Sequence, residues 1–225
     1  MEEFEGLIQL GRKGTKTKTG SMRGLLIQLE GDYALVTNTK RSAVLRIQFG
    51  RVIGTGTFYA NEAPLVAEKI ERREDKVLFE WKEGSNIKRV LIPNQRSILE
   101  EAEKAFSDLY VEPSIRFPLT GFDSLEDLLI TQMAVKENDI TIKQERSDGT
   151  VTFENILKIG KGLMKAEYPE TATISIFTND LLMLKDFIKT LEISLDKDKP
   201  VSLKGTLTFG TSFKGLVSDL RWGEA

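Results

Sequence analysis

The stretch SIRFPLTGFDSLEDLLITQMAVKENDITIKQERSDGTVTFEN, residues 114–155, decides the fold class of this chain. Residues 114–119 are typical of a strand. Residues 122–138 are predicted to form a helix, because Asp123 or Ser124 can cap it and apolar residues recur at helical spacing. The apolar stripe of this helix comprises Leu125, Leu128, Leu129 and Met133. Two alternating segments then flank an Asp-Gly turn, which is typical of a β-hairpin. This order of elements indicates an α+β protein.

The remainder of the second half repeats this organisation. After a strand near ATISIFTN comes a predicted helix over 180–192, followed by three strands that end near residue 220. The inward side chains of this helix are predicted to be Leu181, Leu184, Ile188 and Leu191. Two successive strand–helix–strand units indicate an internal duplication of organisation.

The first half contains short strands between residues 24 and 60, then a predicted helix over 63–75 that Pro64 can open. A hairpin over 75–94 follows. The polar, helix-prone segment 96–110 is the best candidate for a connector. We therefore expect an N-terminal domain over 1–94, a connector over 95–113 and a C-terminal domain over 114–225.

Composition excludes several kinds of chemistry. The 225 residues include 32 Lys+Arg and 34 Asp+Glu, for a net charge of −2, and neither cysteine nor histidine. Disulfides, thiolate zinc sites and Ser-His-Asp triads are therefore impossible, and we expect no metal site and no cofactor. There is no apolar run of transmembrane length, and the start is acidic where a secretory signal is basic. We expect a cytoplasmic protein with no membrane partner.

One short segment, GRKGTKTKTGSMR over 11–23, contrasts with the acidic chain because all its charges are positive. Its glycines do not have the spacing of a phosphate-binding loop, and no helix is predicted to follow it. Two interpretations stay open: a solvated loop, or a loop that contacts a phosphate backbone. The segment lies where the first half lacks a second helix.

Other charged groups allow the same two kinds of interpretation. Cations on the predicted helices 63–75 and 180–192 form either ordinary solvated faces or, if both helices cover one side of a sheet, a surface for a phosphate backbone. The acids Asp123, Glu126 and Asp127 suit the first turn of a helix better than a metal site. The acids of the 195–200 turn, Asp196 and Asp198, lack the pattern of an EF-hand.

Residues 117–155 and 176–220 resemble the DNA sliding clamps, the family of proliferating cell nuclear antigen and the phage processivity factors. The resemblance lies in the strand, helix and Asp-Gly hairpin, then a helix, a strand, a charged turn, Pro200 opening the next strand and a closing hairpin. It implies two clamp-like domains of antiparallel sheet with helices on one face.

The resemblance also implies a non-enzymatic function. Clamps are rings in which edge strands pair across subunits, and two-domain subunits form homotrimers. Double-stranded DNA passes through the ring, and DNA polymerase and the clamp loader dock near the interdomain connection. The DNA-facing residues would be Arg12, Lys13, Lys16, Lys18, Arg23, Lys69, Arg72, Arg73, Lys136, Lys185 and Lys189. The docking residues would be Val90, Ile92, Leu216 and Trp222.

Two alternatives stay open. One is an α+β adaptor that never closes a ring and regulates replication or transcription. The other is a metal-dependent enzyme, which would need a compact group of Asp and Glu side chains in a cleft.

Overall fold

The computed structural model describes residues 2–13, 24–38, 42–125, 130–136, 139–145, 151–158, 173–194 and 199–218. The described elements before the connector are α1 (Glu2–Lys13), β1 (Leu26–Gly31), β2 (Tyr33–Thr37), β3 (Ala43–Gln48), β4 (Gly54–Tyr59), β5 (Lys69–Arg73), β6 (Lys76–Glu83) and β7 (Asn86–Pro93). The later elements are α2 (Leu99–Leu109), β8 (Ile115–Arg116), the 3₁₀ helix η1 (Leu119–Ser124), β9 (Ile130–Lys136), β10 (Asp139–Glu145), β11 (Val151–Lys158), β12 (Thr173–Phe177), α3 (Thr178–Leu182), β13 (Ile188–Ser194), β14 (Val201–Leu207) and β15 (Ser212–Val217).

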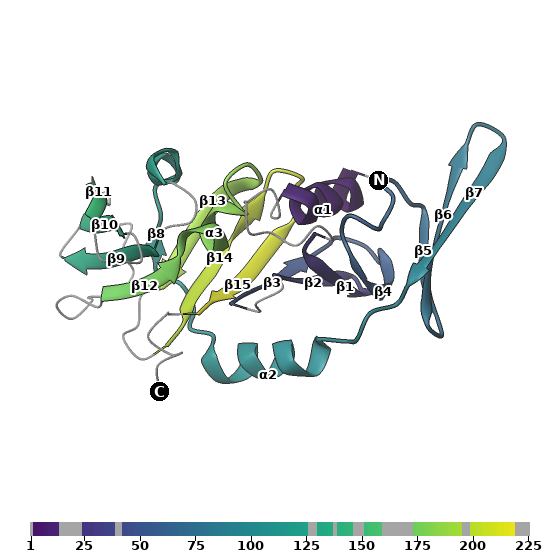
Figure 1. Cartoon of the computed structure of the whole chain (residues 1–225), viewed down its shortest axis with the longest axis horizontal. Helices are drawn as coiled ribbons and strands as arrows, with labels where there is room; N and C mark the ends of the chain where they lie inside the picture. Colours follow the sequence, from purple (N-terminus) through teal and green to yellow (C-terminus); the bar gives the residue numbers. More distant parts are fainter. Residues whose placement is uncertain are drawn as a thin grey trace.

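A single antiparallel sheet joins the two halves of the chain (Figure 1). Its strand order is β4-β1-β2-β3-β15-β14-β13-β8, so four strands come from before α2 and four from after it. The halves meet where β3 pairs with β15, with Arg46 opposite Lys214. Eight strands in one sheet leave no gap between the two predicted domains.

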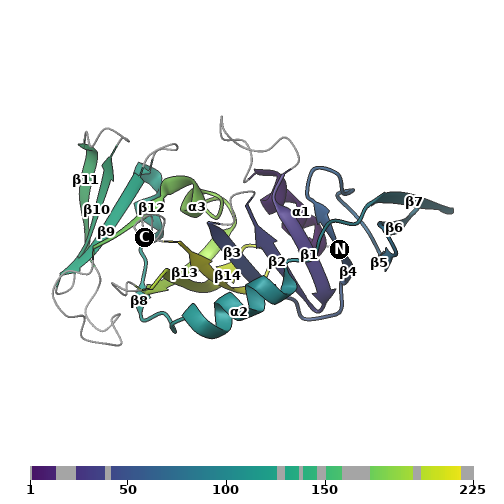
Figure 2. The ribbon, with the colours of Figure 1, turned by 60° about the horizontal axis from the view of Figure 1, so that its bottom comes forward.

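The sheet has a helix on each face because its strands alternate. In β2, Ala34 and Val36 belong to the main core with α1, whereas Leu35 belongs to a smaller cluster with Ile98 and Ala102 at α2. Successive side chains of a strand point to opposite faces, so α1 and α2 cover opposite sides. Figure 2 shows α2 in front of the strands and α1 behind them.

Two smaller sheets lie at opposite ends of the molecule (Figure 1). One has the order β11-β10-β9-β12, and the other has the order β5-β6-β7. The second crosses β4 closely at Gly56, where an added Cβ would lie 2.7 Å from a methyl group of Val77. Gly56 also has φ 147°, a conformation that favours glycine, so the sequence of β4 fixes this crossing.

Three predicted helices are wrong in whole or in part. In the segment 122–138, Ile130–Lys136 is strand β9, which pairs with both β10 and β12. Thr131 and Met133 are both buried there, which is the two-residue period of a strand. Backbone pairing on two sides therefore outweighs the helical spacing of the leucines.

The predicted helix 63–75 is also wrong, since Lys69–Arg73 is strand β5, paired with β6. Of the helix 180–192, only its first residues belong to α3, and its last residues begin β13. All four side chains predicted to point inward are nevertheless buried: Leu181, Leu184, Ile188 and Leu191.

The N-terminal helix was missed. The basic segment 11–23 does not stand in for a helix, because its first residues complete α1. Acidic residues in the first turn and Arg12 and Lys13 in the last turn suit the helix macrodipole. The remainder of the segment, 14–23, lies outside the described residues. None of the described helices is long and apolar enough to cross a membrane.

Candidate functional site

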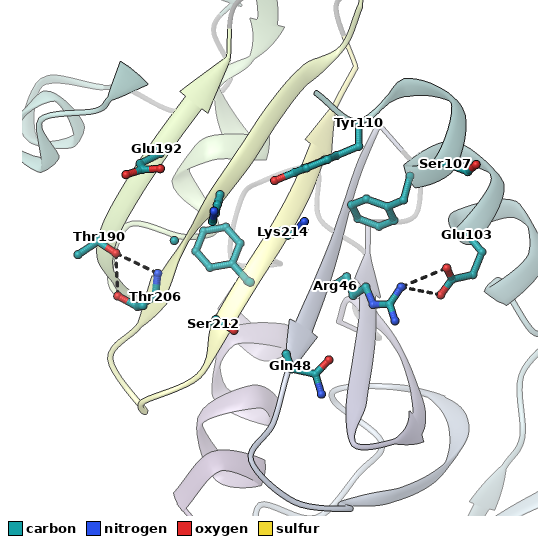
Figure 3. A pocket seen from close by; sticks show the side chains of 14 residues that line it. Arg46, Gln48, Glu103, Ser107, Tyr110, Thr190, Glu192, Thr206, Ser212 and Lys214 are labelled. Carbon is teal, nitrogen blue, oxygen red and sulfur yellow. Dashed lines mark hydrogen bonds and ion pairs between the residues drawn. The ribbon is translucent and has the colours of Figure 1, made fainter. Parts of the chain in front are cut away.

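A groove of about 760 Å³ lies between α2 and the eight-stranded sheet, on the side opposite α1. It crosses the junction between the two halves of the chain. Phe106 and Tyr110, one helical turn apart on and just after α2, form its apolar wall. Their ring centroids lie 6.0 Å apart. Figure 3 shows Tyr110 reaching from the end of α2 over the strands.

The floor of the groove is polar. Cross-strand pairing places Arg46, Lys214, Lys204 and Glu192 in one row across β3, β15, β14 and β13. A second row consists of Gln48, Ser212, Thr206 and Thr190. Directly opposed residues share a face, so both rows project toward α2. The groove is therefore amphipathic, with an aromatic wall and a charged floor.

The middle of α2 is held by a charged contact. Arg46 Nη1 donates to both carboxylate oxygens of Glu103, at 3.0 and 3.1 Å. The guanidinium also stacks on the ring of Tyr33, 4.2 Å from its centroid. Figure 3 shows the side chains of Arg46 and Glu103 meeting across the groove. Within α2 itself only Ala102 is buried, and Leu99 and Phe106 are partly buried against the same small cluster, so the helix is attached by a limited apolar contact together with this ion pair.

The end of the connector is held in the same manner. Glu112 accepts a hydrogen bond from Lys204 and pairs with Lys214, 3.6 Å away. The hydrogen bond from Lys204 lowers the pKa of Glu112 below its ordinary value, and the charges of both lysines add to this effect. The backbone N–H of Val111 donates to Ser202 Oγ at 3.0 Å.

Tyr110 carries an unused hydrogen-bonding group. Its hydroxyl oxygen is buried and has no hydrogen-bond partner among the described residues. Burial raises the pKa of this phenol, and the nearby carboxylates of Glu112 and Glu192 raise it further. The phenol is therefore protonated at neutral pH and can donate to an acceptor that enters the groove.

The described cations expected to face DNA are dispersed, and several are paired. On the α1 side, Lys13 meets Asp186 at 2.9 Å and Lys185 meets Asp123 at 3.6 Å. Arg12 donates to the backbone carbonyls of Ala60 and Ala63, which ties the end of α1 to the loop after β4.

On β5, Lys69 and Arg73 both pair with Glu71, at 3.1 and 3.2 Å. Arg72 points to the other face and pairs with Glu30 at 3.0 Å. The three cations predicted to share one helical face are therefore divided between two faces of a strand. Lys189 is exposed on β13, and Lys136 ends β9. Lys16, Lys18 and Arg23 lie outside the described residues.

The residues expected to dock a partner lie elsewhere than in this groove. Ile92 and Leu216 are buried, and Val90 is half-buried against the main core. Trp222 lies outside the described residues. The sequence features related to the groove are the polar residues of β3, β13, β14 and β15 and an acidic helix followed by Tyr110, and they describe solvated faces equally well.

The described residues contain no group of three or more Asp and Glu side chains placed to hold a metal ion. Asp123 lies in the short 3₁₀ helix η1 and pairs with Lys185. Glu126, Asp127, Asp196 and Asp198 lie outside the described residues.

Comparison with solved structures identifies proteins with a similar fold. One similar chain belongs to the PCNA2–PCNA3 complex of Sulfolobus tokodaii, with a TM-score of 0.61 and 10% identity over 97% of this chain and 96% of that one. Another is a protein of Eubacterium rectale described as a DNA polymerase III beta subunit, with a TM-score of 0.62 and 12% identity. This chain, at 97% coverage, spans 63% of that protein. No family model and no curated protein matches the sequence.

The fold is therefore that of the sliding clamps, and it extends over nearly the whole chain. The α+β class and the clamp-like architecture predicted from residues 117–155 and 176–220 are confirmed.

Proposed function

We propose that this protein is a ring-forming processivity factor that encircles duplex DNA and tethers a DNA polymerase and a clamp loader. The observation that carries this proposal is the clamp fold over 97% of the chain and 96% of a similar clamp subunit. The protein acts by holding and positioning, and catalyses no reaction itself. We also propose the division into an N-terminal domain over 1–94, a connector over 95–113 and a C-terminal domain over 114–225.

Two open strand edges support ring formation. Among the described residues, strand β7 pairs only with β6, and strand β11 pairs only with β10. Each has 8 residues, and the two lie at opposite ends of the molecule (Figure 1). A contact between unlike patches builds a ring when its rotation closes. Pairing β7 of one copy with β11 of the next would also remove two exposed edges, which otherwise promote aggregation.

The outward face of β7 also favours a partner. Ile87 and Leu91 are 55% and 54% exposed and lie on the same face of the strand. We propose that they are covered by the neighbouring subunit of a homotrimer.

The test is the native mass of the protein, by light scattering, with electron micrographs of the same sample. A trimeric ring is expected. The double variant Ile87→Asp/Leu91→Asp should be monomeric, whereas Val52→Asp, which makes one such substitution at a 72% exposed valine, should leave the mass unchanged. A folded wild-type monomer at every concentration would instead favour the adaptor that never closes a ring.

The α1 and α3 side of the sheet is the proposed DNA-facing side. Lys13 and Lys185 are two described cations on this side, and their pairs with carboxylates are exposed enough to exchange for phosphates. The double variant Lys13→Gln/Lys185→Gln should reduce the salt dependence of DNA retention. The slope should fall by roughly 2, because each lost phosphate contact removes about 0.9.

Lys104→Gln, which changes an exposed lysine of α2 on the opposite side of the sheet, is the control for this experiment. Closed circular DNA should be retained after binding, and linear DNA should be released from its ends. Equal retention of both forms would contradict encirclement.

The groove under α2 is the proposed docking site for the polymerase and the loader. It combines an aromatic wall with a polar floor, which is how small recognition sites commonly fix an extended segment.

A further inference from the structure

The floor of the groove contains a row of three cations. Arg46, Lys214 and Lys204 occupy adjacent positions on three neighbouring strands. Like charges directly opposite each other destabilise a sheet. Carboxylates on neighbouring elements must therefore compensate for this row of three cations.

Two of the compensating carboxylates come from the connector. Glu103 on α2 accepts two hydrogen bonds from Arg46. Glu112, just beyond α2, accepts a hydrogen bond from Lys204 and forms an ion pair with Lys214. The connector thus places Glu103 at the Arg46 end of the row and Glu112 at its middle and other end.

These contacts are accessible to solvent. The exposed fractions of the five side chains lie between 34% and 57%. Exposed ion pairs contribute little, roughly a fivefold change in an equilibrium constant at most. A carboxylate from outside can therefore replace Glu103 or Glu112 at small cost.

The groove offers such a carboxylate more than charge. The buried Tyr110 hydroxyl has no hydrogen-bond partner in the described part of the chain, and Phe106 beside it offers an apolar wall. An entering segment that carries both acidic and aromatic side chains would fit both features.

This inference rests on the proposed docking role of the groove. We propose that Glu103 and Glu112 occupy the positions that the carboxylates of an acidic partner segment take when it binds. The carboxylates of that segment take their places on Arg46, Lys204 and Lys214. The connector is then an autoinhibitory strap, because its own acids compete with the partner for the same three cations.

The proposal predicts that two variants which each remove charge change the peptide affinity in opposite directions. Removing charge from the strap, with Glu103→Gln/Glu112→Gln, should tighten binding of an acidic peptide by about fivefold, since the competitor is lost. Removing charge from the floor, with Lys204→Gln/Lys214→Gln, should weaken binding by about tenfold. If the acids were merely structural, their loss would loosen the wall of the groove and weaken binding.

The probe is a fluorescein-labelled peptide of alternating aromatic and acidic residues, followed by fluorescence anisotropy at low and high salt. Its twin has Asn and Gln at the acidic positions. The matched protein control is Glu100→Gln/Asp108→Asn, which removes two exposed carboxylates from α2 that make no described contact with the groove floor. Circular dichroism and thermal unfolding establish that each variant is folded.

Equal affinity for the acidic peptide and its neutral twin would overturn the proposal, and so would weaker binding by the strap variant. A trimeric ring that binds neither peptide would refute this inference and leave the proposed function standing. A monomer that binds the peptides in the predicted order would refute the ring and leave this inference standing.

Discussion

Gln28 anchors the start of the connector, and its replacement by leucine should measurably loosen α2. Gln28 lies on β1 with an exposed fraction of 0%. Its Oε1 accepts the backbone N–H of Ile98 at 2.7 Å, and its Nε2 donates to Glu30 at 2.6 Å. Ser97 Oγ makes a further contact with the same amide at 2.9 Å. One buried side chain therefore fixes the chain just before α2 begins.

The expected loss of stability follows from the backbone N–H donor of Ile98, which loses its acceptor. Gln28→Leu has nearly the same volume, so no cavity forms, but the buried N–H of Ile98 loses its acceptor. A buried unsatisfied donor costs about 1–3 kcal/mol. We expect the free energy of unfolding to fall by about 2 kcal/mol, which for a chain of this size lowers Tm by roughly 4–8 °C.

The assay is urea unfolding followed by circular dichroism, with amide hydrogen exchange of α2 measured in parallel. Gln9→Leu is the control, because Gln9 is exposed on α1 and, within the part of the chain that the structure describes, donates only to Glu5, at 3.1 Å. It should change stability by less than about 0.5 kcal/mol. The reasoning is refuted if Gln28→Leu costs no more than the control, or if exchange in α2 is unchanged.

Three further predictions concern the sheet and the end of the connector. Gly205→Ala should destabilise the protein by about 1–3 kcal/mol in urea unfolding, because the new Cβ would lie 2.0 Å from the carbonyl oxygen of Thr190. Phe79→Ala should cost about 3–5 kcal/mol by the same assay, since this ring is fully buried; a loss below about 1 kcal/mol would show that the site collapses. Lys204 holds the pKa of Glu112 below 4.5, so their contact is fully present above pH 4.5 and is lost as pH falls through the lowered pKa. Glu112→Gln should therefore lose less stability than the wild type on acidification below pH 4.5, measured by urea unfolding at several pH values.

The strands and hairpins of the sheets could be predicted because their signals are local. In the segment 75–94, two strand-like stretches flank the turn Gly84-Ser85-Asn86, and the structure forms β6 and β7 there. Gly84 has φ 62°, a conformation that few other residues adopt without strain. The polar segment 96–110 was likewise expected to be a helix, and α2 confirms it.

The incorrectly predicted helices show that a pattern of buried positions does not by itself distinguish a helix from a strand. Leu184, Ile188 and Leu191 fit one face of a helix, and all three are buried, yet Ile188 and Leu191 belong to β13. A turn followed by a strand buries the same positions as a helix over so short a stretch. Pairing with β14 then satisfies the backbone hydrogen-bonding groups of β13. No residue within the stretch indicates that it will pair with that distant strand.

The groove was not predictable for a related reason. Its floor combines positions from before and after the connector, and Arg46 and Lys214 are 168 positions apart in the sequence. Each strand shows only that alternate residues are polar, which equally describes a solvated face. The polar face became a site because α2 crosses it, and the sequence of α2 does not say which side of the sheet it covers.

The two-sided sheet makes the proposed functions separable by experiment. Adjacent residues of one strand serve different sides: Lys204 lines the groove, whereas Leu203 is fully buried in the core shared with α1. A change at Lys204 should therefore alter partner docking and leave DNA retention intact. A change at Lys13, on α1, should do the reverse. If both variants impaired both activities, the two sides would be coupled through the sheet, and the separate assignments of docking and DNA contact would have to be abandoned.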